Sequence, residues 1–168
     1  MFRPSRRRKT TSEKQHGPSL LNALARSPAV LAGYLGLHQE LAQGRLTAVE
    51  RCLVGLMVAQ RSGSPYCLSV QTRLARKAGL TTEEIAAARE GSADSERQVA
   101  LLFLAGKLVI NRGELADADL AAVRQSGLSD SEIMEVIFHV TLNLSAAAVS
   151  HAARLKPDFP PAPPLLAF

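Results

Sequence analysis

The stretch that decides the fold is Ser64-Pro65-Tyr66-Cys67, which follows an apolar run over residues 52–59 and begins a helical pattern over residues 64–78. A serine at the N-cap and a proline at the first helical position are typical of a helix start. Cys67 then lies in the first turn, where backbone N–H groups converge and the helix dipole is positive. This setting favours the thiolate over the thiol.

Similar start and stop signals along the chain predict an all-α fold. Aromatic residues make up only 4% of the 168 residues, tryptophan is absent, and alanine and leucine dominate, as is typical of helices rather than strands. The length suits one domain with a sizeable core. We expect a compact bundle of about seven helices, with approximate bounds at residues 27–42, 47–61, 64–78, 81–91, 94–111, 117–127 and 129–155. The fourth helix begins at Thr81 or Thr82, and the fifth at Asp94 or Ser95.

The net charge of +5 arises in the first 16 residues, which hold six basic side chains and one acidic side chain. The rest of the chain has fourteen basic and fourteen acidic residues, so we expect a neutral domain over residues 17–156 rather than a basic binding face. Residues 1–16 are expected to form a disordered basic leader, with no indication of a nucleic-acid partner. Residues 157–168 form a proline-rich tail that we expect to be extended.

Cysteine usage and the apolar segments indicate the compartment. Two cysteines do not make a disulfide framework, and this is typical of a reducing compartment. No apolar segment follows the basic start as in a secretory signal, and we expect no membrane-spanning stretch. The sequence therefore predicts a cytoplasmic protein that does not bind membranes.

Several short segments occur in an order that resembles one known family. They are Ser27-Pro28-Ala29-Val30-Leu31, Leu46-Thr47-Ala48-Val49-Glu50-Arg51, Ser64-Pro65-Tyr66-Cys67, Ala78-Gly79-Leu80, Asp117-Ala118-Asp119-Leu120, Gly127-Leu128-Ser129-Asp130, Leu142-Asn143, His151 and Asp158-Phe159-Pro160. Over roughly residues 25–160 the chain resembles the carboxymuconolactone decarboxylase and alkylhydroperoxidase D superfamily, in its peroxidase-related branch. The resemblance implies the alkylhydroperoxidase D-like all-α fold and a homo-oligomer, either a trimer or a hexamer.

The chain departs from the family at the catalytic motif. Active members carry Cys-x-x-Cys-x-x-x-His at a helix start and a Glu on the preceding helix. By this resemblance the first cysteine falls on Ser64, and the second, which is the family's peroxide-reacting thiol, falls on Cys67. The histidine falls on Gln71 and the glutamate on Cys52. Three of the four positions differ, so the resemblance supports the fold more strongly than the activity.

The substitutions remove parts of a two-thiol mechanism. Ser64 cannot resolve a sulfenic acid or a mixed disulfide, and we expect it to act as an N-cap. Gln71 shares a helix face with Cys67 and can hydrogen-bond, but it cannot relay a proton as an imidazole does. Cys67 is either a reactive thiol or a small buried side chain. Cys52 either fills the core or faces Cys67 as a relocated resolving thiol that closes a disulfide on oxidation.

One histidine, His151, is a candidate for the site. His151 follows the apolar spacing of the last helix, which favours a core position, while its match to a family histidine favours a place in the pocket. His139 shares a helix side with Glu135 and Asn143. The sequence has no metal-ligand spacing and no glycine-rich phosphate loop, so we expect neither a metal nor a cofactor.

These residues are compatible with two main functions. The leading hypothesis is a thiol-dependent redox protein of peroxidase type, alkylhydroperoxidase-like or peroxiredoxin-like, with a degraded motif and Cys67 as its thiol. It would use a small-molecule substrate and a thiol reductant that the sequence does not identify. The alternative is a catalytically inactive family member retained for binding or assembly. Lactone decarboxylation or isomerisation is a third hypothesis, but the sequence shows no convincing acid–base pair for it.

Overall fold

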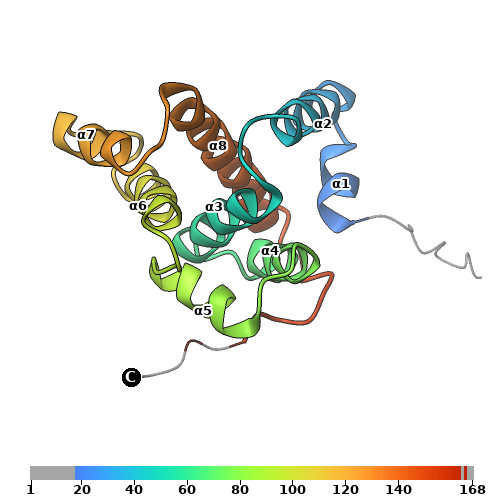
Figure 1. Ribbon diagram of the computed structural model, residues 1–168. Coiled ribbons are helices and arrows are strands. Elements are labelled where there is room, and N and C mark those ends of the chain that lie inside the picture. The colour runs from blue at the N-terminus through green and yellow to red at the C-terminus, as the bar shows by residue number, and fades with distance from the viewer. Residues whose placement is uncertain (1–17, 164, 166–168) are drawn as a thin grey trace, which may run out of the picture.

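The computed structural model describes residues 18–163 and 165, and this part of the chain contains helices but no strand (Figure 1). The predicted all-α fold is therefore confirmed. Eight helices are formed in the described residues: α1 (Ser19–Leu24), α2 (Pro28–Ala42), α3 (Ala48–Arg61), α4 (Pro65–Lys77), α5 (Thr82–Glu90), α6 (Glu96–Ile110), α7 (Asp117–Gln125) and α8 (Asp130–Ala152).

The helices begin where the capping residues are. Thr47, Ser64 and Ser129 each accept a hydrogen bond from the backbone N–H three residues later, which satisfies one of the free donors of a helix N-terminus. Of the alternative caps, Thr81 and Ser95 are the ones used.

Two boundaries differ from the sequence-based expectation. Helix α1 was not predicted, because it has only six residues and no side-chain cap. Helix α8 ends at Ala152 rather than near Leu155. Its chain turns at Arg154, which has a φ of 51°, and Leu155 N–H donates to the carbonyl of Ser150 at 2.9 Å. This left-handed turn closes the helix with local hydrogen bonds that the sequence pattern did not indicate.

Helix α3 is the centre of the domain and packs against α4, α5, α6 and α8 (Figure 1). All eight residues from 52 to 59 are buried. A helix that is apolar on every side must be covered on every side, so the other helices surround it. The core around α3 includes the fully buried side chains of Leu56, Leu101, Leu102, Leu104 and Val136.

Arg97 joins three of the helices through two carboxylates. Its Nε lies 2.7 Å from Glu50 on α3, and its Nη2 lies 2.5 Å from Glu132 on α8. Both carboxylates also accept from the N-cap backbones of their own helices, at Thr47 and Ser129. These hydrogen bonds from Arg97 and Ser129 lower the pKa of Glu132 to about 2. For Glu50, burial acts to raise the pKa, but the hydrogen bonds outweigh it and leave the pKa below its ordinary value.

The proline-rich tail runs along the body of the domain near α4 and α5 (Figure 1). No residue from 157 to 163 is helical. Phe159 lies under the guanidinium of Arg73, 4.6 Å from the ring centroid, and the carbonyl of Pro163 accepts from Arg89 at 2.5 Å. The expected basic leader, residues 1–16, lies outside the described residues, as do three of the last four residues.

The sequence analysis expected no membrane-spanning stretch, but helix α8 passes the length and hydropathy test for one. Among the described residues it alone is long and apolar enough to span a bilayer by length and composition, with a mean hydropathy of 1.5. Core helices of soluble proteins pass the same test. In this fold α8 packs against α1, α2, α3, α4 and α6, as a core helix does.

We predict that Arg97→Met lowers the free energy of unfolding at neutral pH by about 2–3 kcal/mol, because it leaves the carboxylates of Glu50 and Glu132 without their cation. The variant should also change the pH dependence. The folded-state pKa of Glu132 is depressed from 4.5 to about 2, so its stabilising contribution is present above pH 4.5 and is lost as the pH falls towards 2. Urea unfolding between neutral pH and pH 3 should show a smaller acid-induced loss in Arg97→Met than in the wild type.

Arg124→Met is the matched control for this measurement. Arg124 pairs with Asp130, and the two side chains are 52% and 78% exposed, so its loss should cost below about 1 kcal/mol. Equal effects of the two substitutions would show that the Arg97 network does not hold the helices together.

Candidate functional site

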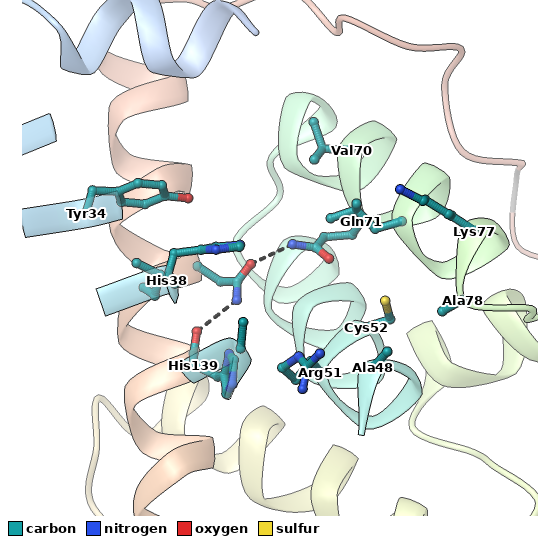
Figure 2. Close-up of a pocket in the computed structure, with 14 residues that line it drawn as sticks. Tyr34, His38, Ala48, Arg51, Cys52, Val70, Gln71, Lys77, Ala78 and His139 are labelled. Carbon is teal, nitrogen blue, oxygen red and sulfur yellow. Dashed lines mark hydrogen bonds between the residues drawn. The ribbon is translucent and has the colours of Figure 1, made fainter. Parts of the chain in front are cut away.

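A cavity of about 420 Å³ opens between α2, α3, α4 and α8 (Figure 2). Two of the four family motif positions, Cys52 and Gln71, lie in its wall. The other residues that line it are Tyr34, His38, Ala42, Ala48, Arg51, Val70, Leu74, Lys77, Ala78, His139, Leu142 and Asn143. The wall is largely apolar and carries a few polar and cationic groups, as is typical of a small-molecule site.

Gln71 is held in place by a chain of hydrogen bonds. Its Nε2 donates to Oδ1 of Asn143 at 2.8 Å, and Nδ2 of Asn143 donates to the carbonyl of His139 at 2.8 Å; both bonds are dashed in Figure 2. The amide also lies against α3, because a Cβ on Gly55 would come within 2.4 Å of Oε1 of Gln71. Gly55 thus allows α4 to approach α3 with the glutamine between them.

Cys52 is buried at the cavity wall and belongs to the main core cluster. Burial raises the pKa of its thiol, and the nearby positive charge of Arg51 partly opposes that rise. The expectation that Cys52 fills the core holds, and the same side chain also contacts the cavity.

His139 is buried at the opposite wall, with 6% of its surface exposed. Its Nε2 has no hydrogen-bond partner within the described part of the chain. Burial, followed by the charge of Arg51, lowers the pKa of His139 to about 4, while Glu135 and the backbone of Leu41 oppose the shift. The imidazole is therefore neutral at physiological pH.

Cys67 lies outside this cavity. It is buried, with 7% of its surface exposed, in a separate cluster with Ala59, Tyr66, Ala146 and Ala147. Burial raises the pKa of its thiol above the ordinary value, although hydrogen bonds to the hydroxyls of Ser64 and Ser150 oppose the rise. Of the two alternatives for Cys67, the structure has the small buried side chain, and burial acts against the thiolate that a helix start favours.

Ser64 has the N-cap role that its place in the sequence predicted. Its Oγ accepts from the backbone N–H of Cys67 at 3.1 Å and lies 2.8 Å from Oγ of Ser150. The Ser150 Oγ also lies 2.8 Å from the carbonyl of Ala147, and either hydroxyl can be the donor between the two serines. Both serines are buried, and their hydroxyls join the start of α4 to the end of α8.

The cluster around Cys67 is covered by the N-terminal helix. Leu20 of α1 and Tyr34 of α2 pack against the cluster. Asp158 of the tail holds α1 in this position through three hydrogen bonds. Its carboxylate accepts from the backbone N–H of Ser19 at 2.9 Å, from the Ser19 hydroxyl at 2.5 Å and from the Tyr66 hydroxyl at 2.7 Å. Burial and the Asp158 carboxylate together raise the pKa of Tyr66 far above its ordinary value, so Tyr66 stays a donor.

Cys52 and Cys67 lie in different parts of the structure. Both are free, buried thiols. Cys52 belongs to the main core cluster at the cavity wall, and Cys67 belongs to the separate cluster outside the cavity. A disulfide requires Cα atoms within about 7 Å, and closure of a Cys52–Cys67 disulfide on oxidation stays a prediction.

His151 is exposed at the end of α8 and does not line the cavity. Its Nε2 lies 3.2 Å from the carbonyl of Ser62 in the loop before α4. The expected core position was wrong, because α8 reaches the surface in its last turn. Within the described residues, no three His, Cys, Asp or Glu side chains gather in a group that could hold a metal ion.

Sequence reasoning missed most of the polar groups of the cavity. Arg51 and Lys77 carry no spacing signal, and their place in the wall follows from how α3 and α4 pack. His139 and Asn143 were placed on one side of the last helix, which was a partial signal, since both line the cavity.

Residues 28–105 match the family model described as the Carboxymuconolactone decarboxylase family. A comparison with curated proteins found no match. The fold resembles several solved structures. An uncharacterized peroxidase-related protein from Silicibacter sp. TM1040 superposes with a TM-score of 0.75 at 20% identity, over 84% of this chain and 76% of that chain. A putative antioxidant defence protein AhpD from Agrobacterium tumefaciens superposes with a TM-score of 0.74 at 18% identity, over 83% and 97% of the two chains.

A third similar structure has a different chemistry. The debrominase Bmp8, in complex with 2,3,4-tribromopyrrole, superposes with a TM-score of 0.74 at 15% identity, over 83% of this chain and 76% of that chain. The family model covers 78 of the 168 residues, and the similar structures share the all-α fold of this chain. At these identities the structural likeness itself shows the fold alone.

We predict that Asp158→Ala makes Cys67 more reactive. Loss of the carboxylate frees Ser19 and Tyr66, so α1 should open more often and expose the thiol. Alkylation with iodoacetamide, followed by peptide mass spectrometry, should give a severalfold higher rate at Cys67 and an unchanged rate at Cys52. In the wild type the Cys67 rate should be low at neutral pH and rise only in alkaline buffer, because the pKa of the thiol is raised.

Glu83→Ala removes an exposed carboxylate of α5 and serves as the control, with no effect on either thiol. Fast alkylation of Cys67 in the untreated wild type would contradict the cover described above.

Proposed function

We propose that the protein is a small-molecule-binding member of its superfamily, with its ligand in the cavity between α2, α3, α4 and α8, and that it does not reduce peroxides by a two-thiol mechanism. The observation that carries this proposal is the separation of the thiol from the cavity. Cys52 and Gln71 line the cavity, whereas Cys67 is buried outside it under α1.

The size and lining of the cavity support a binding role. Its volume of about 420 Å³ falls within the range of small-molecule sites, about 300–1,000 Å³. Apolar side chains such as Val70, Leu74 and Leu142 form much of the wall. The polar groups are held in fixed positions by the Gln71–Asn143–His139 hydrogen bonds, and a preorganised wall lowers the entropic cost of binding.

Thiol-dependent redox activity of peroxidase type is the second candidate. One observation favours it, since the hydroxyls of Ser64 and Ser150 hydrogen-bond to Cys67 and act to lower the pKa of its thiol. Three observations oppose it: burial has the larger effect on that pKa, Ser64 supplies no resolving thiol, and the amide of Gln71 is already bound to Asn143.

A homo-oligomer and a cytoplasmic location remain proposals that follow from the family and from the cysteine usage. Large apolar side chains are exposed on α6 and α8, which is compatible with contacts between copies of the chain. They include Phe103, Ile110, Met134 and Phe138.

We predict that the wild type and Cys67→Ser consume tert-butyl hydroperoxide at the same low rate in the presence of dithiothreitol, because the thiol is covered and has no partner thiol. The double variant Ser64→Cys with Gln71→His should be faster than both, since it restores a resolving thiol and an imidazole. A clear loss of activity in Cys67→Ser would show that the thiol-dependent candidate is the right one.

Binding itself is tested by ligand-observed NMR with a set of monocyclic organic compounds. Ala48→Phe places a large ring at an exposed position of the cavity wall and should abolish the binding signals. Ala118→Phe makes the same change at an exposed position near the start of α7, away from the cavity, and should leave them intact. Absence of binding by every compound to the wild type, or equal binding to Ala48→Phe, would contradict the proposal.

A further inference from the structure

The cavity carries positive charge that its own lining does not neutralise. Arg51 and Lys77 line it, and no Asp or Glu does. Arg51 donates from Nη1 to the carbonyl of Leu46, and within the described residues its other guanidinium N–H groups have no protein partner. A largely apolar cavity with two cations and no carboxylate in its wall attracts an anion.

The unpartnered nitrogen of His139 identifies a second feature of the ligand. One ring nitrogen is engaged with the backbone of Leu41, so the free one, Nε2, is the acceptor of the neutral imidazole. A buried acceptor without a partner is uncommon in folded proteins. His139 lines the cavity, but Nε2 itself is buried from solvent. An O–H group of an occupant therefore supplies the missing hydrogen bond only if the wall around the ring shifts when the ligand binds.

The charged and titratable groups around His139 keep it an acceptor. His38 from α2 and Arg51 from α3 both lower its pKa, and Glu135 on its own helix opposes them. The Glu135 carboxylate is engaged elsewhere, because it accepts from the backbone N–H groups of Arg45 and Leu46 at 2.8–3.2 Å. With a pKa of about 4, the imidazole is too weak a base to remove a proton from a hydroxyl group at neutral pH. Its role is therefore recognition of the ligand.

We propose that the cavity binds a small hydroxycarboxylic acid, whose carboxylate lies at Arg51 and whose hydroxyl donates to Nε2 of His139. This inference rests on the proposed binding function and specifies the ligand of that site. Arg51 sets the charge of the ligand, and His139 distinguishes a hydroxylated acid from its unsubstituted analogue. The apolar side chains of Val70, Leu74 and Leu142 leave room for a ring or a short hydrocarbon chain between the two polar ends.

Calorimetry with four probes tests the two polar contacts separately. The probes are 3-hydroxybenzoate, 4-hydroxybenzoate, benzoate and 3-hydroxybenzyl alcohol. At least one hydroxybenzoate should bind about tenfold more tightly than benzoate, which corresponds to one added hydrogen bond of about 1.4 kcal/mol. The alcohol, which has no carboxylate, should bind more weakly than the hydroxybenzoates.

Variants assign each preference to its residue. His139→Phe should abolish the difference between hydroxybenzoate and benzoate while benzoate binding is kept, and Arg51→Gln should abolish the preference for the carboxylate. Circular dichroism and the melting temperature check that each variant is folded. Because His139→Phe is a core change, the wild-type protein with ¹⁵N-labelled histidine gives a second readout. Its Nε2 resonance should shift with the tighter hydroxybenzoate and remain near its free position with benzoate.

The outcomes separate this inference from the proposed function. If the acids bind but the hydroxyl changes neither the affinity nor the Nε2 resonance, the assignment of His139 is wrong and the binding function stands. If the alcohol binds as well as the acids, the assignment of Arg51 is wrong. If none of the four probes binds while other compounds of the NMR set do, the ligand class is wrong. If no compound binds at all, both the inference and the proposed function fail.

Discussion

Burial of helix α3 on all its sides is the constraint on which the rest of the structure depends. Its residues from 52 to 59 are all buried, so other helices must cover every face, and α4, α5, α6 and α8 do so. The first turn of this helix carries Glu50, which is the one buried carboxylate among the described residues. Arg97 reaches that carboxylate from α6 and continues to Glu132 on α8, so one cation fixes how three helices meet. An ion pair of this kind must be complete, because a buried charge without its partner is costly.

The register of α3 against α4 determines what the candidate site contains. Gly55 has no side chain, and the amide of Gln71 occupies the space that a Cβ would need. Cys52 and Arg51 lie in the cavity wall beside this contact, whereas Cys67 belongs to a separate cluster. The separation matters for function, because a group can act on a ligand only if it reaches the same cavity. The chain thus shares the fold of the similar structures, while Cys67 lies outside the cavity.

The substituted motif positions have structural roles of their own. Ser64 caps α4 and ties it to Ser150 of α8. Gln71 connects α4 to α8 through Asn143. Tyr66, which lies between two of the motif positions, joins the tail to α1 through Asp158 and Leu20. Each side chain has hydrogen bonds within the protein that support the geometry around it, and such satisfied polar groups rigidify a core. His139 differs, since its Nε2 is buried without a partner, and an orphaned acceptor is the group that a ligand gains most from satisfying.

The sequence by itself determined the fold class and most helix boundaries, and the family match was visible in its short segments. The physical reason is that caps are local: Thr47, Ser64 and Ser129 each accept a hydrogen bond from a backbone N–H three residues away.

Only the tertiary structure decided which of the candidate groups lie close together. Helix α1 depends on Asp158, which is 139 residues from Ser19, and the low reactivity expected of Cys67 depends on burial beneath that helix. Arg51 and His139 become a pair only because α3 and α8 pack together. The pKa of Cys67 and that of His139 follow from desolvation, which depends on the packing of distant segments and cannot be inferred from neighbours in the sequence.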